Sequence, residues 1–110
     1  MAFCNIYIGN ADDPRFHWDG GDHSGNIPNI LFDLGCPGLI GCAEARRLLE
    51  SQKYGGKVLD WGSSGARLLK EQILEFANEF FHEDWQRERA VRKIQTLDPA
   101  RIYILFACEQ

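Results

Sequence analysis

The apolar segment at residues 101–108 constrains the fold of this chain more than any other feature. It reads RIYILFAC, with a near-continuous run of hydrophobic side chains after the arginine. A short run of this kind is typical of a β-strand that is covered on both faces of its sheet. Residues 3–8, FCNIYI, have the β-branched and aromatic character of a second strand. We expect both strands to lie in one small sheet, with helices packed on it.

Glycine divides the chain into two parts of different character. All 11 glycines fall between Gly9 and Gly65, and the last 45 residues contain none. The first part includes residues 10–29, which are rich in Asp, Gly, Asn and Pro and lack apolar periodicity. Loops of this length within a domain are usually functional or mobile. We therefore predict a Gly- and Asp-rich loop region at about 10–41 that holds a site, followed by a rigid scaffold.

Three segments have the sequence pattern of helices. Residues 42–52 are rich in good helix formers and precede Gly55-Gly56, which is a common stop signal. Residues 65–82 repeat apolar side chains at spacings of three and four. Residues 83–97 have a narrower apolar face, and the sequence leaves open whether they continue the preceding helix after a bend.

These segments predict an α+β fold. A short strand is expected at 57–61 and a short strand or turn at 30–34, in addition to the N- and C-terminal strands. The predicted architecture is a three- to four-stranded sheet packed with two or three helices, and an α/β fold is the alternative. The chain has 110 residues, 45% of them hydrophobic, which predicts a single domain over residues 1–110.

The negative charge is concentrated near the N-terminus. The formal net charge is −4, and residues 1–41 hold five acids and one base, whereas the remainder holds 11 of each. This balance argues against direct binding to nucleic acid or to an anionic membrane, because both need a basic surface. No apolar run approaches the roughly 18–20 residues of a membrane-spanning helix. An acidic segment favours a cationic partner, such as a basic protein surface.

The cysteines are interpreted as reduced. The chain has four, at Cys4, Cys36, Cys42 and Cys108. The first ten residues have no basic region ahead of the apolar run, so we expect no secretory signal and a cytoplasmic location. Cys4 and Cys108 lie in strand-like runs, where cysteine acts as a small hydrophobic residue.

A zinc site built on Cys36 and Cys42, with His17 and His23 as further candidate ligands, is disfavoured by the spacing of the two cysteines. Five residues separate them, whereas structural zinc usually takes cysteines two to four residues apart. Cys42 also stands near a predicted helix start, where a thiol becomes more acidic, but no neighbouring base is identifiable.

The loop region contains a cluster of possible metal ligands. His17, Asp19, Asp22 and His23 place two imidazoles and two carboxylates within seven residues. Such ligands suit a hard or borderline cation, although their order matches no established metal loop. The other interpretation is a polar turn with side-chain caps. The leading prediction includes no cofactor.

The turn from Gly62 to Arg67 follows a predicted strand and opens the predicted helix at 65–82. Free N–H groups at such a position can bind phosphate. A helix cap formed by Ser63 or Ser64 explains the same residues without a ligand and is preferred.

An acidic ridge is expected along the second helix. Glu71, Glu75, Glu79 and Glu83 recur at intervals of four, so they repel one another on one helical face. Such a run is either a solvated face or a docking strip for a basic protein. The loop residues expected to join it in partner binding are Asp12, Asp13, Trp18, Asp19 and Asp22.

Two functions from different classes follow from these patterns. The first is a small acidic inhibitor or regulator that covers a basic surface of a partner protein, such as a nuclease toxin. Immunity proteins, antitoxins and anti-defence proteins share this size and charge, which is an analogy and not a shared motif. The alternative is a small metal-dependent enzyme or metal-binding protein that uses His17, Asp19, Asp22 and His23. No assembled catalytic set is recognisable, and the oligomeric state is left open.

Overall fold

The computed structural model describes residues 4–20 and 25–109 and confirms the α+β class. The described residues form five strands, one more than the largest number expected, and three α-helices. The elements in chain order are β1 (Cys4–Asn10), a short 3₁₀-helix η1 (Trp18–Gly20), β2 (Ile30–Gly35), α1 (Gly38–Leu49), β3 (Lys57–Asp60), β4 (Ser63–Leu69), α2 (Lys70–Phe80), α3 (Asp84–Ile94) and β5 (Ile102–Glu109).

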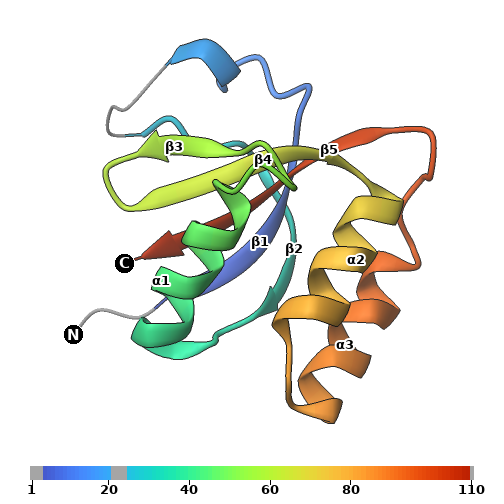
Figure 1. Ribbon diagram of the computed structural model, residues 1–110. Coiled ribbons are helices and arrows are strands. Elements are labelled where there is room, and N and C mark those ends of the chain that lie inside the picture. The colour runs from blue at the N-terminus through green and yellow to red at the C-terminus, as the bar shows by residue number, and fades with distance from the viewer. Residues whose placement is uncertain (1–3, 21–24, 110) are drawn as a thin grey trace.

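The five strands form one antiparallel sheet with the order β2-β1-β5-β4-β3. The C-terminal strand β5 is central, because Leu105 is opposite Ile8 of β1 on one side and Ala66 of β4 on the other. The expectation that the first and last strands share a sheet is therefore confirmed. Figure 1 shows β5 crossing the middle of the sheet.

The helices cover one face of the sheet and the chain after β1 covers the other (Figure 1). On the helix side, Leu105 packs in the same core cluster as Ile73 and Phe76 of α2. On the loop side, Phe106 and Ile104 pack with Phe16, and Trp18 lies against this second cluster. The consecutive residues of β5 are thus buried on alternate faces, which confirms the interpretation of the apolar run at 101–108.

The segment predicted as a helix at 65–82 begins with a strand, so this prediction was wrong at its start. Residues Ser63–Leu69 form β4, which pairs with β3 and β5, and helix α2 starts at Lys70. Gly65 lies where a Cβ would come within 2.8 Å of Phe106 Cβ and 2.9 Å of Leu59 Cδ1. Pairing on both edges overrides the local helical pattern, because it satisfies the backbone of β4 and buries its side chains on both faces.

The other helix boundaries also differ from expectation. Helix α1 spans Gly38–Leu49, so it begins and ends earlier than 42–52, and the chain turns later at Gly55, whose φ is +66°. Helices α2 and α3 are separate, because the backbone is extended at Phe81 and at Glu83. Glu83 therefore lies beyond α2, and the four glutamates do not share one helix.

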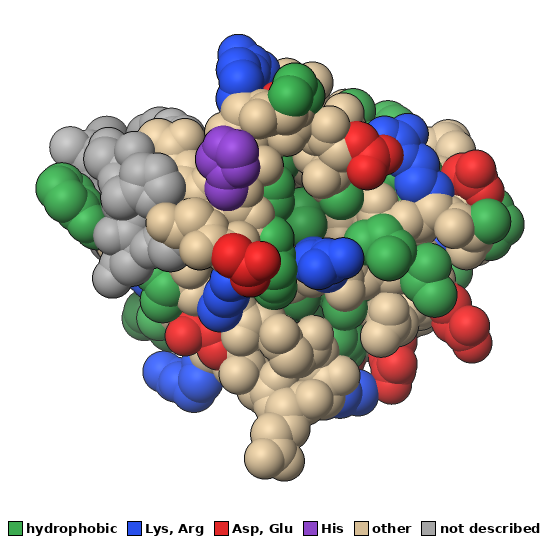
Figure 2. All heavy atoms as spheres, turned by 90° about the horizontal axis from the view of Figure 1, so that it is seen from above, with side chains coloured by type: hydrophobic (Ala, Val, Ile, Leu, Met, Phe, Trp, Pro, Cys, Tyr) green, Lys and Arg blue, Asp and Glu red, His purple; other side chains and the backbone are tan. Residues whose placement is uncertain are grey.

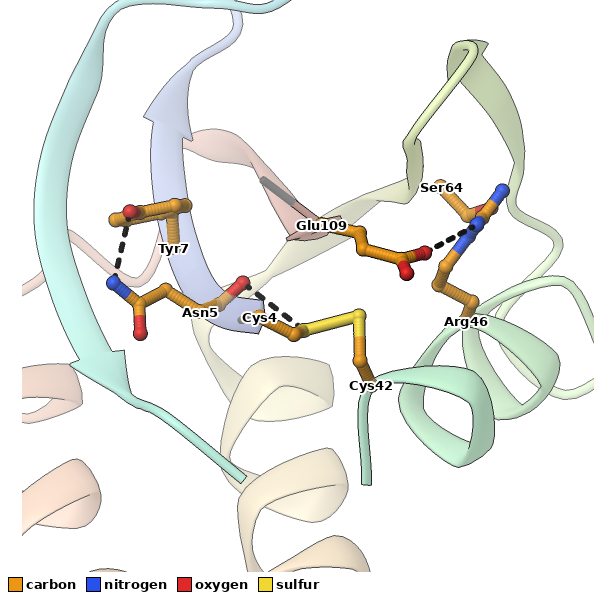
Figure 3. The surroundings of a disulfide bond; sticks show 7 residues. All are labelled: Cys4, Asn5, Tyr7, Cys42, Arg46, Ser64 and Glu109. Carbon is orange, nitrogen blue, oxygen red and sulfur yellow. Dashed lines mark hydrogen bonds and ion pairs between the residues drawn. A yellow bond between two sulfur atoms is a disulfide. The ribbon is translucent and has the colours of Figure 1, made fainter. Parts of the chain in front are cut away.

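The structure corrects the prediction that all four cysteines are reduced. Cys4 of β1 and Cys42 of α1 form a disulfide, with their Cα atoms 5.4 Å apart (Figure 3). Cys36 is exposed and Cys108 is buried, and neither belongs to this disulfide. The disulfide also removes Cys42 from any zinc site and from a nucleophilic role. Spacing could not reveal the pair, because the packing of α1 on β1 brings the two side chains together.

In the part of the chain that the structure describes, no helix combines the length and the apolar composition needed to cross a membrane.

Candidate functional site

The outer face of α2 carries an acidic strip, which we define as Glu71, Glu75 and Glu79. Intervals of four residues place these side chains above one another on the same side of a helix. All three are exposed, with relative side-chain exposures of 56% for Glu75 and 41% for Glu79. The carboxylates predicted as a docking ridge are thus accessible along the length of α2.

Lys53, from the turn after α1, lies against the strip. Its Nζ is 3.1 Å from Glu75 Oε1 and 2.8 Å from Glu79 Oε1. The hydrogen bond to Glu79, followed by that to Glu75, raises the pKa of Lys53, and the same lysine lowers the pKa of Glu79. Lys53 is therefore a fixed cation that offsets part of the negative charge of the strip.

Tyr54 fixes Glu79 from beneath. Its hydroxyl donates a hydrogen bond to Glu79 Oε1 at 3.0 Å, and its ring packs edge-on against Phe76 with centroids 5.6 Å apart. Burial, and secondarily the hydrogen bond to Glu79, raises the pKa of Tyr54 to about 12. Sequence reasoning missed Lys53 and Tyr54, because they belong to a separate segment and do not lie at helical intervals from the glutamates of α2.

Asp13 is a structural residue, which corrects its assignment to partner binding. Its side chain is only 5% exposed, and its Oδ1 and Oδ2 accept hydrogen bonds from the backbone N–H groups of Arg15 and Asn29 at 3.0 and 2.8 Å. The Arg15 N–H is the main cause that lowers the pKa of Asp13. The carboxylate points into the loop because it supplies acceptors that the folded backbone needs.

Asn26 is a second buried polar residue that organises the loop, and sequence reasoning did not single it out. Its Oδ1 accepts from the backbone N–H of His17, and its Nδ2 donates to the carbonyl oxygens of His17 and Leu59 at 3.1 and 3.2 Å. Asn26 therefore links His17, earlier in the loop, to Leu59 of β3. A lone asparagine in a polar stretch carries no sequence signal for this role.

The exposed acids of the loop have cations beside them. The side chain of Asp12 is 82% exposed and lies 3.9 Å from Arg101, and that of Asp19 is 97% exposed and lies 3.6 Å from Lys57. Both are accessible, as expected, but each contributes to a surface of mixed charge. Figure 2, which looks onto this side of the molecule, shows acidic and basic side chains interspersed with hydrophobic ones.

Trp18 is anchored on the sheet. Its ring lies 4.6 Å from Lys57 Nζ and 5.7 Å from the guanidinium carbon of Arg67, and it packs against the cluster that contains Phe16 and Phe106. Cation–π contacts of this kind hold an aromatic ring and its cations together. Trp18 is half-buried, so only part of it is available to a partner.

The possible metal ligands of the loop are only partly placed. His17 and Asp19 are exposed, whereas Asp22 and His23 lie outside the described residues. Among residues 4–20 and 25–109, no three His, Cys, Asp or Glu side chains are grouped closely enough to hold a metal ion.

The serine cap that was preferred for the turn from Gly62 to Arg67 was wrong, and the less favoured phosphate-binding turn also lacks the helix start that it needs. Ser63 and Ser64 are fully buried in β4, and the helix begins later at Lys70. The Ser64 hydroxyl donates to Glu50 Oε2 at 2.9 Å and accepts from Arg46 Nε at 3.0 Å. Arg46 also approaches Glu109 at 3.7 Å (Figure 3). These side-chain contacts join α1 to the sheet, and Ser63 and Ser64 pair with Cys108 and Ala107 of β5, so the two serines stand in a strand and not at a helix start.

Comparison of the chain with models of protein families, with curated proteins and with solved structures found no match.

Proposed function

We propose that this protein is an inhibitor or regulator that binds a basic surface of a partner protein through the acidic strip on α2. One observation carries the proposal. The strip presents three carboxylates on one exposed helical face, and Lys53 is the only cation within ion-pairing distance of them among the described residues. Two negative charges are left for a partner. A nuclease toxin is a suitable class, because its nucleic-acid cleft is positively charged.

The contacts beneath the strip favour binding. Lys53 and Tyr54 both hold Glu79 Oε1, so this carboxylate is positioned before any partner arrives. A preorganised group loses less conformational freedom on association. Complementary charge would act mainly on the association rate and on the choice of partner. Glu83, just beyond the end of α2, is exposed and extends the acidic surface toward α3.

The loop has a smaller part in this proposal than its sequence suggested. Asp12 and Asp19 lie beside Arg101 and Lys57, and Asp13 is buried. A basic partner would therefore meet a more negative surface on α2 than on the described part of the loop.

The cytoplasmic location expected from the sequence belongs to the same proposal, since an inhibitor of an intracellular toxin acts there. The Cys4–Cys42 disulfide weighs against this location, because structural disulfides are rare in the reduced cytosol. Free thiols are blocked at the moment of cell lysis, and the mass of the protein then gives the number of blocked cysteines, which differs between a reducing and an oxidising compartment. Four blocked cysteines would support the cytoplasmic location, whereas two, the number that the Cys4–Cys42 disulfide leaves, would contradict it.

The proposal is tested by photo-crosslinking in the native cell. A photoreactive amino acid replaces Glu71, which makes no ion pair with a described residue, and in a second variant it replaces Glu88, an exposed glutamate of α3. We expect one protein with a basic surface to be captured at position 71 and not at position 88. Capture of the same proteins at both positions would contradict a docking role for the strip.

Association kinetics with the captured partner test the electrostatic mechanism. We expect Glu71→Lys to lower the association rate several-fold at low salt, and added salt to reduce the rate of the native protein. Glu88→Lys makes the same charge change on the neighbouring helix and is the matched control. An association rate that is insensitive to both salt and Glu71→Lys would overturn the proposal.

A further inference from the structure

A cavity of about 290 Å³ opens on the loop-covered side of the sheet. It lies between the chain after β1 and the strands β4 and β5, with Asp12, Phe16, Trp18, Arg67, Ile102 and Ile104 among the residues that line it. Figure 2 looks onto this side of the molecule and shows a hollow with hydrophobic side chains between charged ones. Its volume is just below the range for small-molecule sites, which is roughly 300–1,000 Å³, so it suits a small ligand.

The inner wall of the cavity is apolar. Ile104 is 1% exposed and Phe16 is 7% exposed, so both belong to the packed layer beneath the loop. Ile102 lies two residues earlier on the same strand face and is 41% exposed. A ligand would therefore place a hydrophobic body against these side chains and against Trp18.

Arg67 supplies a cation at the rim. It is opposite Ile104 in the β4–β5 register, so its side chain leaves the sheet on the cavity side. Its guanidinium lies over the Trp18 ring and makes no ion pair with a described carboxylate. By contrast, Lys57 on the same ring faces Asp19, and Asp12 faces Arg101. Among the described residues that line this cavity, the charge without an ion-pair partner is therefore positive.

We propose that this cavity binds a small monoanion with a planar apolar body, such as an aromatic carboxylate. Arg67 would donate hydrogen bonds to the carboxylate, because a guanidinium held on an aromatic ring presents its N–H donors in a fixed plane. The planar body would fill the space beside Trp18, Phe16 and Ile104. This site lies on the opposite side of the sheet from α2, and the proposal does not depend on the acidic strip.

Isothermal titration calorimetry with 2-naphthoate, its neutral analogue 2-naphthamide, and acetate tests the proposal. We expect naphthoate to bind saturably and about ten-fold more tightly than naphthamide, which corresponds to about 1.4 kcal/mol. Acetate lacks the apolar body and should show no saturable binding. Chemical-shift changes on adding naphthoate should centre on the Trp18 indole and on Ile104.

Two arginine variants distinguish binding of naphthoate at the cavity from nonspecific attraction of the anion to any exposed arginine. Arg67→Gln should raise the Kd of naphthoate to that of naphthamide, while leaving naphthamide binding unchanged. Arg47→Gln is the matched control, since Arg47 is an exposed arginine of α1 on the helix-covered side. Equal affinity of the native protein for naphthoate and naphthamide would overturn the proposal, as would the absence of saturable naphthoate binding. An equal effect of the two substitutions would also overturn it.

Discussion

Lys53 and Glu79 are 26 residues apart in the chain, yet their side chains meet at 2.8 Å and join the turn after α1 to the outer face of α2. The contact has two roles. It fixes the position of α2 relative to the rest of the helical layer, and it partly neutralises the surface that we propose for partner binding. The same carboxylate also accepts the hydrogen bond from Tyr54.

Replacing Glu79 by Gln should destabilise the protein in a pH-dependent way. We expect a loss of about 1 kcal/mol or less near pH 7, the usual size for an exposed ion pair. The pKa of Glu79 is lowered from its ordinary value of 4.5, chiefly by Lys53, so the folded state binds the proton more weakly than the unfolded chain. The stabilisation is therefore present above that value and is lost as the pH falls through the folded pKa.

Urea titrations of the native protein and Glu79→Gln at about pH 7 and about pH 3 check this sign. The difference in unfolding free energy should shrink at the lower pH. Glu71→Gln is the matched control and should change little at either pH, because Glu71 has no ion-pair partner among the described residues. A difference that grows on acidification would contradict the assignment.

Replacing Asp13 by Asn should lower the urea midpoint more than replacing its neighbour Asp12. Asp13 accepts backbone N–H bonds from Arg15 and Asn29, whereas Asp12 is exposed. Asparagine keeps one acceptor oxygen but has an amide nitrogen in place of the other, so it can accept only one of these two bonds. Because the pKa of Asp13 is below its ordinary value of 3.8, this contribution is present above that value and is lost as the pH falls through the folded pKa. Equal effects of Asp13→Asn and Asp12→Asn would argue against the structural role of Asp13.

Removing the disulfide should cost about 4 kcal/mol of unfolding free energy. Cys4 and Cys42 are 38 residues apart, and the chain-entropy model gives this size for a loop of that length. The measurement is urea denaturation of Cys4→Ser/Cys42→Ser against the native protein, with Cys36→Ser as the control at an exposed cysteine. Thiol titration of the denatured native protein should find two reactive groups, and four would show that the bond is absent.

Replacing Gly65 by Ala distinguishes the strand from the helix that the sequence predicted there. In a helix, this change stabilises by roughly 0.5–1 kcal/mol, because alanine is the better helix former. In β4, the added Cβ would lie 2.8 Å from Phe106 Cβ, so we expect a loss of about 1–3 kcal/mol from overpacking. Thermal or urea denaturation shows whether Gly65→Ala raises or lowers the free energy of unfolding.

Residue spacing in the sequence predicts one part of the candidate site and cannot predict the other. Intervals of four place Glu71, Glu75 and Glu79 on one helical face whatever the tertiary structure, and the three are exposed along α2. Spacing could not show that Lys53 lies against two of them, because that contact depends on how two distant segments pack. It also could not show that Asp13 is buried, because its partner Asn29 is brought near by the path of the loop.

The sequence by itself determined the elements whose burial follows from their local composition. The apolar run of β5 predicts a strand covered on both faces, since a continuous hydrophobic stretch has no side to turn toward water. The helical pattern of α2 holds from Lys70 onward for the same local reason.

Only the tertiary structure decided where β4 begins, which cysteines pair and which acids meet a cation. Residues Ser63–Leu69 become a strand because β3 and β5 offer hydrogen bonds on both sides. Cys4 meets Cys42 because α1 packs on β1, and Lys53 meets Glu79 because α1 and α2 cover the same face of the sheet. Each of these outcomes is a contact between segments far apart in the chain, and side-chain spacing within one segment carries no information about such contacts.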